Sequence, residues 1–367
     1  MDWRASAKQL TESLLKKMAW ESQCKPLLKS HNFPVGLGTE GTKKKLFEAF
    51  EKDEIFAQRF HQEFYQHYIQ LVYSGDCTLK IFNVETSLFK TVFKQLETIE
   101  PVQSISSLNF PYLIPNDQLS HLSKETHLAF KGEYDRCLYL FFSTNRTIQE
   151  RTNINPNVLE DGSEVKEFLK KYSSITAISE NPRQYIDVVC LNPKDNTIEI
   201  RLDTSSIVAA KDINKLFIEI IEAFSALLQT EIIKIFRNPI NLFPLIQSLY
   251  ASENCKVCEL NFISAGGYVH SERDRSKTGD VRKGDFHIGG AKKCKIKPYK
   301  ISTRWNSGFN DKLPYLYELS LNSSYRELSK VDGGVLEHAI ISSCPTISDL
   351  NKVLTILKPN DELSKAS

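Results

Sequence analysis

The chain lacks the features by which membrane, secreted and fibrous proteins are recognised. None of its apolar runs reaches the roughly 18 residues needed to cross a bilayer. The opening residues, Met1-Asp2-Trp3-Arg4, contain no apolar signal core. Glycine and proline contribute only 15 and 14 of 367 residues, which excludes collagen-like and low-complexity chains. Because 41% of the residues are hydrophobic, we expect a globular cytoplasmic protein with a sizeable core and no membrane partner.

Short motifs of several enzyme classes are also missing. The sequence contains no phosphate-binding loop that ends in Gly-Lys-Ser/Thr, no Gly-x-Ser-x-Gly elbow and no His-Glu-x-x-His. Its eight cysteines are dispersed, and several lie in apolar runs, as Cys137 does before residues 138–142. This distribution indicates buried free thiols in a reducing compartment.

The spacing of the apolar residues predicts a mixed α+β fold. Residues 1–75 are expected to be helical, because two apolar stripes recur every three or four residues. The stripes are Trp3, Ala7, Leu10, Leu14 and Met18, and then Phe56, Phe60, Phe64 and Tyr68 before a stop at Gly75. A linker is expected between them, around Pro26 to Gly38.

Residues 76–250 are expected to form a central unit of strands and helices, and residues 251–367 a β-rich part. In the central unit we expect strands at 77–84 and 137–142, helices near 89–96 and 162–172, a hairpin of 185–191 with 197–202, and helices at 212–228 and 239–250. Asp212 is the expected N-cap of the helix at 212–228. The C-terminal part is expected to have strands from Lys256 and near 294–303, 315–321 and 335–342, and a last helix at 346–357 capped by Thr346.

Net charge is only +2, so any attraction for a polyanion must be local. Residues 266–305, here called the basic segment, provide such a feature: from Tyr268 to Gly308 there are eleven Lys and Arg against four Asp and Glu. Recurrent glycines let backbone amides approach phosphates, and interleaved aromatics such as Tyr268, Phe286, Tyr299 and Trp305 can stack on bases. The pattern predicts a glycine-rich loop that binds single-stranded or irregular nucleic acid; a solvated loop without a ligand is the alternative. The expected contacts are Arg273, Arg275, Lys277, Arg282, Lys283, His287, Lys292, Lys293 and Arg304.

The predicted hairpin carries a second candidate site. Asp187 lies in its first strand, and Glu199-Ile200-Arg201 lies in the return strand. This arrangement resembles the core of PD-(D/E)xK nucleases, in which an acid on one strand and acid-x-Lys on the next bind a metal that activates water. The resemblance covers about 65 residues and implies catalytic roles for Asp187, Glu199 and Arg201 with Mg²⁺ as cofactor. It departs from the family at Arg201, since arginine stays protonated where lysine is expected. A non-catalytic core and an ordinary amphipathic hairpin are the alternatives.

Cys255 and Cys258 are spaced like one edge of a zinc site, with His270, His287 and Cys294 downstream. No second close pair accompanies them, and Cys258 equally fits the alternation of a buried strand. No metal ligand is therefore assigned.

Three functions remain open from the sequence. The first is a nucleic-acid or polyanion binding protein that acts through the basic segment and needs no cofactor, in a setting such as prokaryotic antiviral defence or a mobile element. The second is a metal-dependent nuclease at Asp187 and Glu199. The third is a non-catalytic subunit whose aromatic N-terminal helices bind a protein partner.

Overall fold

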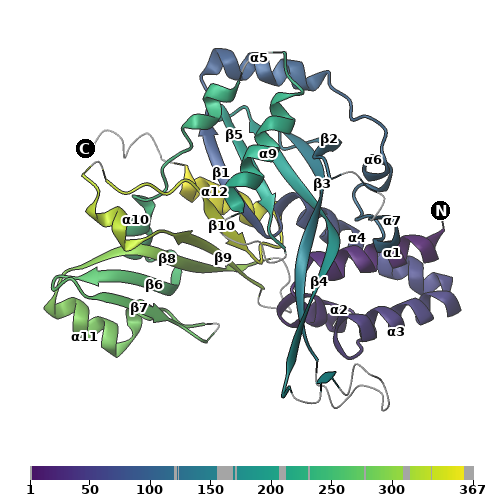
Figure 1. The fold of residues 1–367 in the computed structure, drawn as a ribbon, viewed down its shortest axis with the longest axis horizontal. Coiled ribbons are helices and arrows are strands. Elements are labelled where there is room, and N and C mark those ends of the chain that lie inside the picture. The colour runs from purple at the N-terminus through teal and green to yellow at the C-terminus, as the bar shows by residue number, and fades with distance from the viewer. Residues whose placement is uncertain are drawn as a thin grey trace.

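The computed structural model describes residues 2–119, 122, 124–154, 168–169, 172–205, 212–229, 232–276, 278–308, 315–331 and 333–358. Across these residues, ten strands form one antiparallel sheet, and helices cover both of its faces (Figure 1). The fold is mixed α+β with helices at the N-terminus, as the sequence predicts. None of the described helices is long and apolar enough to cross a membrane.

One strand near the middle joins the two halves of the sheet. β1 pairs with β5 from the central region on one side and with β10 from the C-terminal region on the other. Residues 76–250 and 251–367 therefore share a single continuous sheet. Its order is β2 (His127–Tyr134), β3 (Cys137–Ile154), β4 (Ile175–Asn192), β5 (Thr197–Asp203), β1 (Cys77–Asn83), β10 (Ala339–Ser342), β9 (Tyr315–Asn322), β8 (Ile296–Ser307), β6 (Lys256–Ser264) and β7 (Val269–Arg273).

The helices divide into groups that bury different parts of the sheet. The first four contact one face of β3 and β4, whereas α5 and α9 cover the opposite face, and α10 and α12 pack on the C-terminal half. Their bounds are α1 (Trp3–Lys17), α2 (Lys25–Ser30), α3 (Gly38–Lys52), α4 (Glu54–Ser74), α5 (Thr86–Glu97), α6 (Ile105–Asn109), α7 (Asn116–Leu119), α9 (Ile213–Ser225), α10 (Leu245–Ala251), α11 (Asp285–Lys293) and α12 (Ile347–Leu357).

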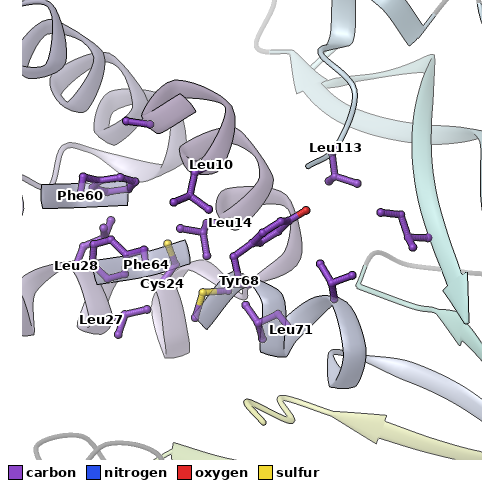
Figure 2. Close-up of a cluster of buried hydrophobic side chains, with 14 of the residues drawn as sticks. Leu10, Leu14, Cys24, Leu27, Leu28, Phe60, Phe64, Tyr68, Leu71 and Leu113 are labelled. Carbon is purple, nitrogen blue, oxygen red and sulfur yellow. The ribbon is translucent and has the colours of Figure 1, made fainter. Parts of the chain in front are cut away.

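The aromatic stripe of the N-terminal helices is core. Phe60, Phe64 and Tyr68 of α4 are fully buried among leucines of α1 and α2 (Figure 2). A stripe that is already covered by the chain's own helices offers no aromatic surface to a protein partner. The third hypothesis therefore loses the feature on which it was based.

Two predicted helix termini are confirmed, and each is closed by a hydrogen bond to the backbone. The amide of Gly75 closes α4 on the carbonyl of Leu71, and Thr346 caps α12 by accepting a hydrogen bond from the amide of Asp349 at 3.1 Å. Asp212 precedes α9 as expected, but its side chain makes no capping hydrogen bond. The expected linker is partly helical, since it contains α2 and leads directly into α3. The expected helix at 162–172 lies almost wholly outside the described residues.

The strand predicted at 137–142 is too short. β3 runs to Ile154 and pairs along its whole length with β4, which begins at Ile175 (Figure 1). Beyond Ser143 the described side chains of β3 are mostly polar or exposed, and no hydrophobic face marks the strand. Pairing between the two strands, which local sequence does not reveal, extends the ribbon.

Asp76, at the start of β1, is a carboxyl group whose ionisation opposes folding. Burial, reinforced by the charge of Asp203, raises its pKa from 3.8 to about 6, although the Ser343 amide and Lys17 act in the other direction. Since the folded pKa lies above the unfolded one, the stability that the proton confers is complete below pH 4 and is lost as the pH rises to 6. We expect Asp76→Asn to be more stable than the wild type by about 2 kcal/mol at pH 8, because the amide oxygen still accepts from Ser343.

Urea denaturation of both proteins between pH 4 and pH 8 measures this difference. The two stabilities should converge towards pH 4. A constant difference across the range would show that ionisation of Asp76 is not its cause.

Candidate polyanion-binding cleft

A cleft of about 670 Å³ lies in the C-terminal half of the sheet, where β6 begins and β8 ends. One wall is the turn that follows α10, residues 251–255, and another is the short 3₁₀ turn Val281–Lys283. The ends of strands β6, β8 and β9 complete it with Lys256, Trp305 and Leu316. Three of the nine predicted nucleic-acid contacts line this cleft: Arg282, Lys283 and Arg304.

Arg282 stabilises one wall of the cleft, and all of its N–H donors are engaged within the protein. Its Nη1 donates to the carbonyls of Tyr250 at 2.9 Å and Ser252 at 2.5 Å. Its Nη2 donates to the carbonyl of Cys255 at 2.6 Å and to Asp280, and its Nε also donates to Asp280. A guanidinium has five N–H donors, so all are engaged. Arg282 therefore positions the turn after α10 rather than binding phosphate, which corrects its predicted role.

Arg304 is partly engaged and lies beside a second cation. Its guanidinium donates to Glu318 at 3.1 Å and to the carbonyl of Ser276 at 3.2 Å. In the sheet, Arg304 of β8 lies directly opposite Lys256 of β6. Like charges that face each other across two strands repel, so an anion bound between them would be stabilised by both.

Lys256 and Lys283 are the unpaired cations of the cleft. Both are exposed, and within the described residues neither makes a hydrogen bond or an ion pair. Asp280 compensates Arg282 and Glu318 compensates Arg304, so the two lysines are opposed only by the exposed carboxylate of Glu253. The sequence analysis did not select Lys256, because it precedes the basic segment; its place at the start of a predicted strand was the only signal.

The basic segment is ordered as strand, turn, helix and strand, not as a loop. It contains β7, the 3₁₀ turn, α11 and most of β8. Arg273, Arg275, Lys292 and Lys293 are exposed but do not line the cleft, and Lys277 lies outside the described residues. Lys292 and Lys293 end α11 next to the start of β8, which pairs with the end of β6 that lies away from the cleft. Arg273 approaches Glu259 at 3.9 Å.

His287 is buried and holds α11 in place. Its Nδ1 lies 2.7 Å from Glu272 of β7, and its Nε2 lies 3.0 Å from the hydroxyl of Tyr250. Phe262 of β6 packs against the same ring at 5.8 Å between centroids. These contacts explain why a helix forms despite Gly289 and Gly290 in its middle, since tertiary packing overrides weak helix propensity. They also remove His287 from the predicted binding surface.

Asp187 and Glu199 do not converge. Asp187 lies opposite Phe142, on the face covered by α5 and α9, whereas Glu199 lies opposite Cys190, on the face covered by the N-terminal helices. Successive residues of a strand point to opposite faces, so the sheet separates the two carboxylates. One metal ion therefore does not contact both carboxylates in this arrangement.

Each carboxylate is instead bound by the protein. Asp187 accepts from the amide of Asp203 at 2.8 Å and forms an ion pair with Arg146; burial raises its pKa, and Arg146 opposes the shift. Glu199 accepts from Arg201 at 2.5 Å and from Lys358 at 3.1 Å. Within the residues that the structure describes, no three His, Cys, Asp or Glu side chains are grouped to hold a metal ion.

The thiols of Cys255 and Cys258 also have hydrogen-bond partners within the protein. Cys258 is buried and donates to the carbonyl of Ser302 at 3.3 Å, and burial raises the pKa of its thiol to about 12. Burial likewise raises the pKa of Cys255. Zinc binds the thiolate, which this environment disfavours.

Residues 36–41, which lead into and form the first turn of α3, have the spacing Gly-x-Gly-x-x-Gly, but no strand precedes them, as a dinucleotide-binding site would require. Gly36 is needed there for packing, since a Cβ atom would lie 2.3 Å from the backbone of Gly41. The glycines therefore shape the entry to a helix.

No protein-family model matches the chain, and no curated protein matches it either.

Proposed function

We propose that this protein binds nucleic acid through the cleft between β6, β8 and the 3₁₀ turn. The observation that supports the proposal is that two exposed lysines, Lys256 and Lys283, come together in a cleft without a carboxylate bound to either. Arg304 adds free N–H donors beside Lys256. Ammonium and guanidinium groups neutralise phosphates.

The cleft contains no arrangement for chemistry on a phosphodiester. Among its described lining residues, the carboxylate of Asp280 is bound to Arg282, the carboxylate of Glu253 is exposed, and burial raises the pKa of the Cys255 thiol. We therefore propose a binding role for this cleft.

Fluorescence anisotropy of a labelled oligonucleotide tests the proposal. We expect binding at about 50 mM salt that weakens as salt rises, with a slope of log K against log salt near −1.4 if two phosphates of a single strand are neutralised. No binding at low salt, or binding that does not change with salt, would contradict it.

A further inference from the structure

The cleft combines its cations with one aromatic surface. Of the six aromatic and histidine side chains in and beside the basic segment, Trp305 lines the cleft. His287 and Tyr299 are buried, His270 stacks on Phe262, and Tyr268 and Phe286 are exposed elsewhere. Trp305 follows Arg304 in β8, so its side chain leaves the opposite face of the sheet from Arg304 and Lys256, and both faces contribute to the cleft at the strand ends.

The indole ring of Trp305 is fixed before any ligand arrives. Its Nε1 donates to the carbonyl of Asn254 at 3.0 Å. Tyr317, its partner across the strands, stacks on one side of the ring at 5.6 Å between centroids and 21° between planes. The ring is only partly buried and lines the cleft, so part of it is accessible there. A flat aromatic surface held in this way can stack on a base without a further loss of side-chain entropy.

We infer that the cleft takes a single strand of nucleic acid with one unpaired base stacked on Trp305 and the adjacent phosphates at Lys256 and Lys283. This inference rests on the proposed function and names its ligand class. A volume of about 670 Å³ is within the range of sites that enclose small organic ligands, which is the size of one or two nucleotides. A duplex keeps its bases stacked and would have to extrude one to reach the ring, so it is disfavoured.

The test compares three labelled ligands of about 12 nucleotides: a single strand, an abasic strand of the same charge, and a duplex. For the wild type we expect the single strand to bind about tenfold more tightly than the abasic strand, and more tightly than the duplex. The abasic strand retains every phosphate, so the ratio isolates the contribution of the bases.

Two variants test whether the ring of Trp305 causes the difference in affinity between the single strand and the abasic strand. Trp305→Leu should lower the ratio of single-strand to abasic affinity to near one and leave the salt slope unchanged, because the lysines remain. Trp305→Phe keeps a stacking surface and should retain most of the ratio of single-strand to abasic affinity. If the leucine variant does not fold, the phenylalanine variant and the abasic strand together still test the inference.

The outcomes separate this inference from the proposed function. Equal binding of the single and abasic strands by the wild type would overturn the stacking inference and leave polyanion binding intact. A nucleoside monophosphate that binds as tightly as the strand would also overturn it, since the cleft would then be a mononucleotide site. Failure of all ligands to bind at low salt would remove the proposed function as well.

Discussion

Glu199→Ala is expected to destabilise the protein by about 3–5 kcal/mol, the cost of removing one partner from a buried ion pair. Glu199 is 1% exposed and is the carboxylate partner of both Arg201 and Lys358. Without it, the guanidinium of Arg201 retains, among the residues that the structure describes, only the carbonyl of Tyr73 as a hydrogen-bond acceptor. Urea denaturation with circular dichroism measures the loss, and Asp195→Ala is the matched control. Asp195 pairs with the same Lys358 from a far more exposed position, so its removal should cost less than about 1 kcal/mol.

The same variant separates a structural role from a catalytic one. If Glu199 is structural, Mg²⁺ should not change the midpoint of unfolding of the wild type. A rise in the wild-type midpoint with Mg²⁺ that is absent in Glu199→Ala would instead show that the carboxylate binds metal, and would restore the nuclease hypothesis.

Reversing the charge of both cleft lysines is expected to weaken oligonucleotide binding by about 100-fold at low salt. Lys256→Glu with Lys283→Glu removes two charge-assisted contacts, each of which contributes about 1.5–3 kcal/mol, and adds repulsion. Both side chains are exposed and unpaired among the described residues, so stability should change by less than about 0.5 kcal/mol per site.

The control for this variant changes the net charge by the same amount elsewhere. Lys90 and Lys94 are exposed on α5, which covers the opposite half of the sheet from the cleft (Figure 1). Lys90→Glu with Lys94→Glu should leave binding within about threefold of the wild type, because charges farther apart than a Debye length are screened. An equal loss in both double variants would show that binding follows the overall charge and not the cleft.

Elements with a regular apolar period could be predicted from the sequence, because that period directly reports one buried face. The stripe of α4, the alternation of β5 and the broad face of α9 all correspond to side chains that are buried in the structure. Elements that lack such a face could not be delimited. α3 buries only Thr42, Leu46 and Phe50 along its 15 residues, and it lies in the region expected to be helical without bounds of its own. α11 buries only His287, and it was expected to be loop.

The site could be predicted only in part, for a different physical reason. Sequence shows how many cations a segment carries but not which of them the fold already pairs. Arg282 is hydrogen-bonded to Asp280 and to the end of α10, and His287 is hydrogen-bonded to Glu272. The end of α10 lies outside the basic segment, so the sequence of that segment does not reveal this partner. Lys256 joins the cleft only because β6 pairs with β8. The separation of Asp187 from Glu199 depends on strand register, which places them on opposite faces.

The salt dependence of the double lysine variant tests most directly whether the cleft is the binding site. If Lys256 and Lys283 each neutralise one phosphate of a single strand, the slope of log K against log salt should be shallower in Lys256→Glu/Lys283→Glu than in the wild type by about 1.4. The α5 control should run parallel to the wild type. A double variant whose line is parallel to that of the wild type would contradict the account, because the two lysines would then make no contact with the phosphates.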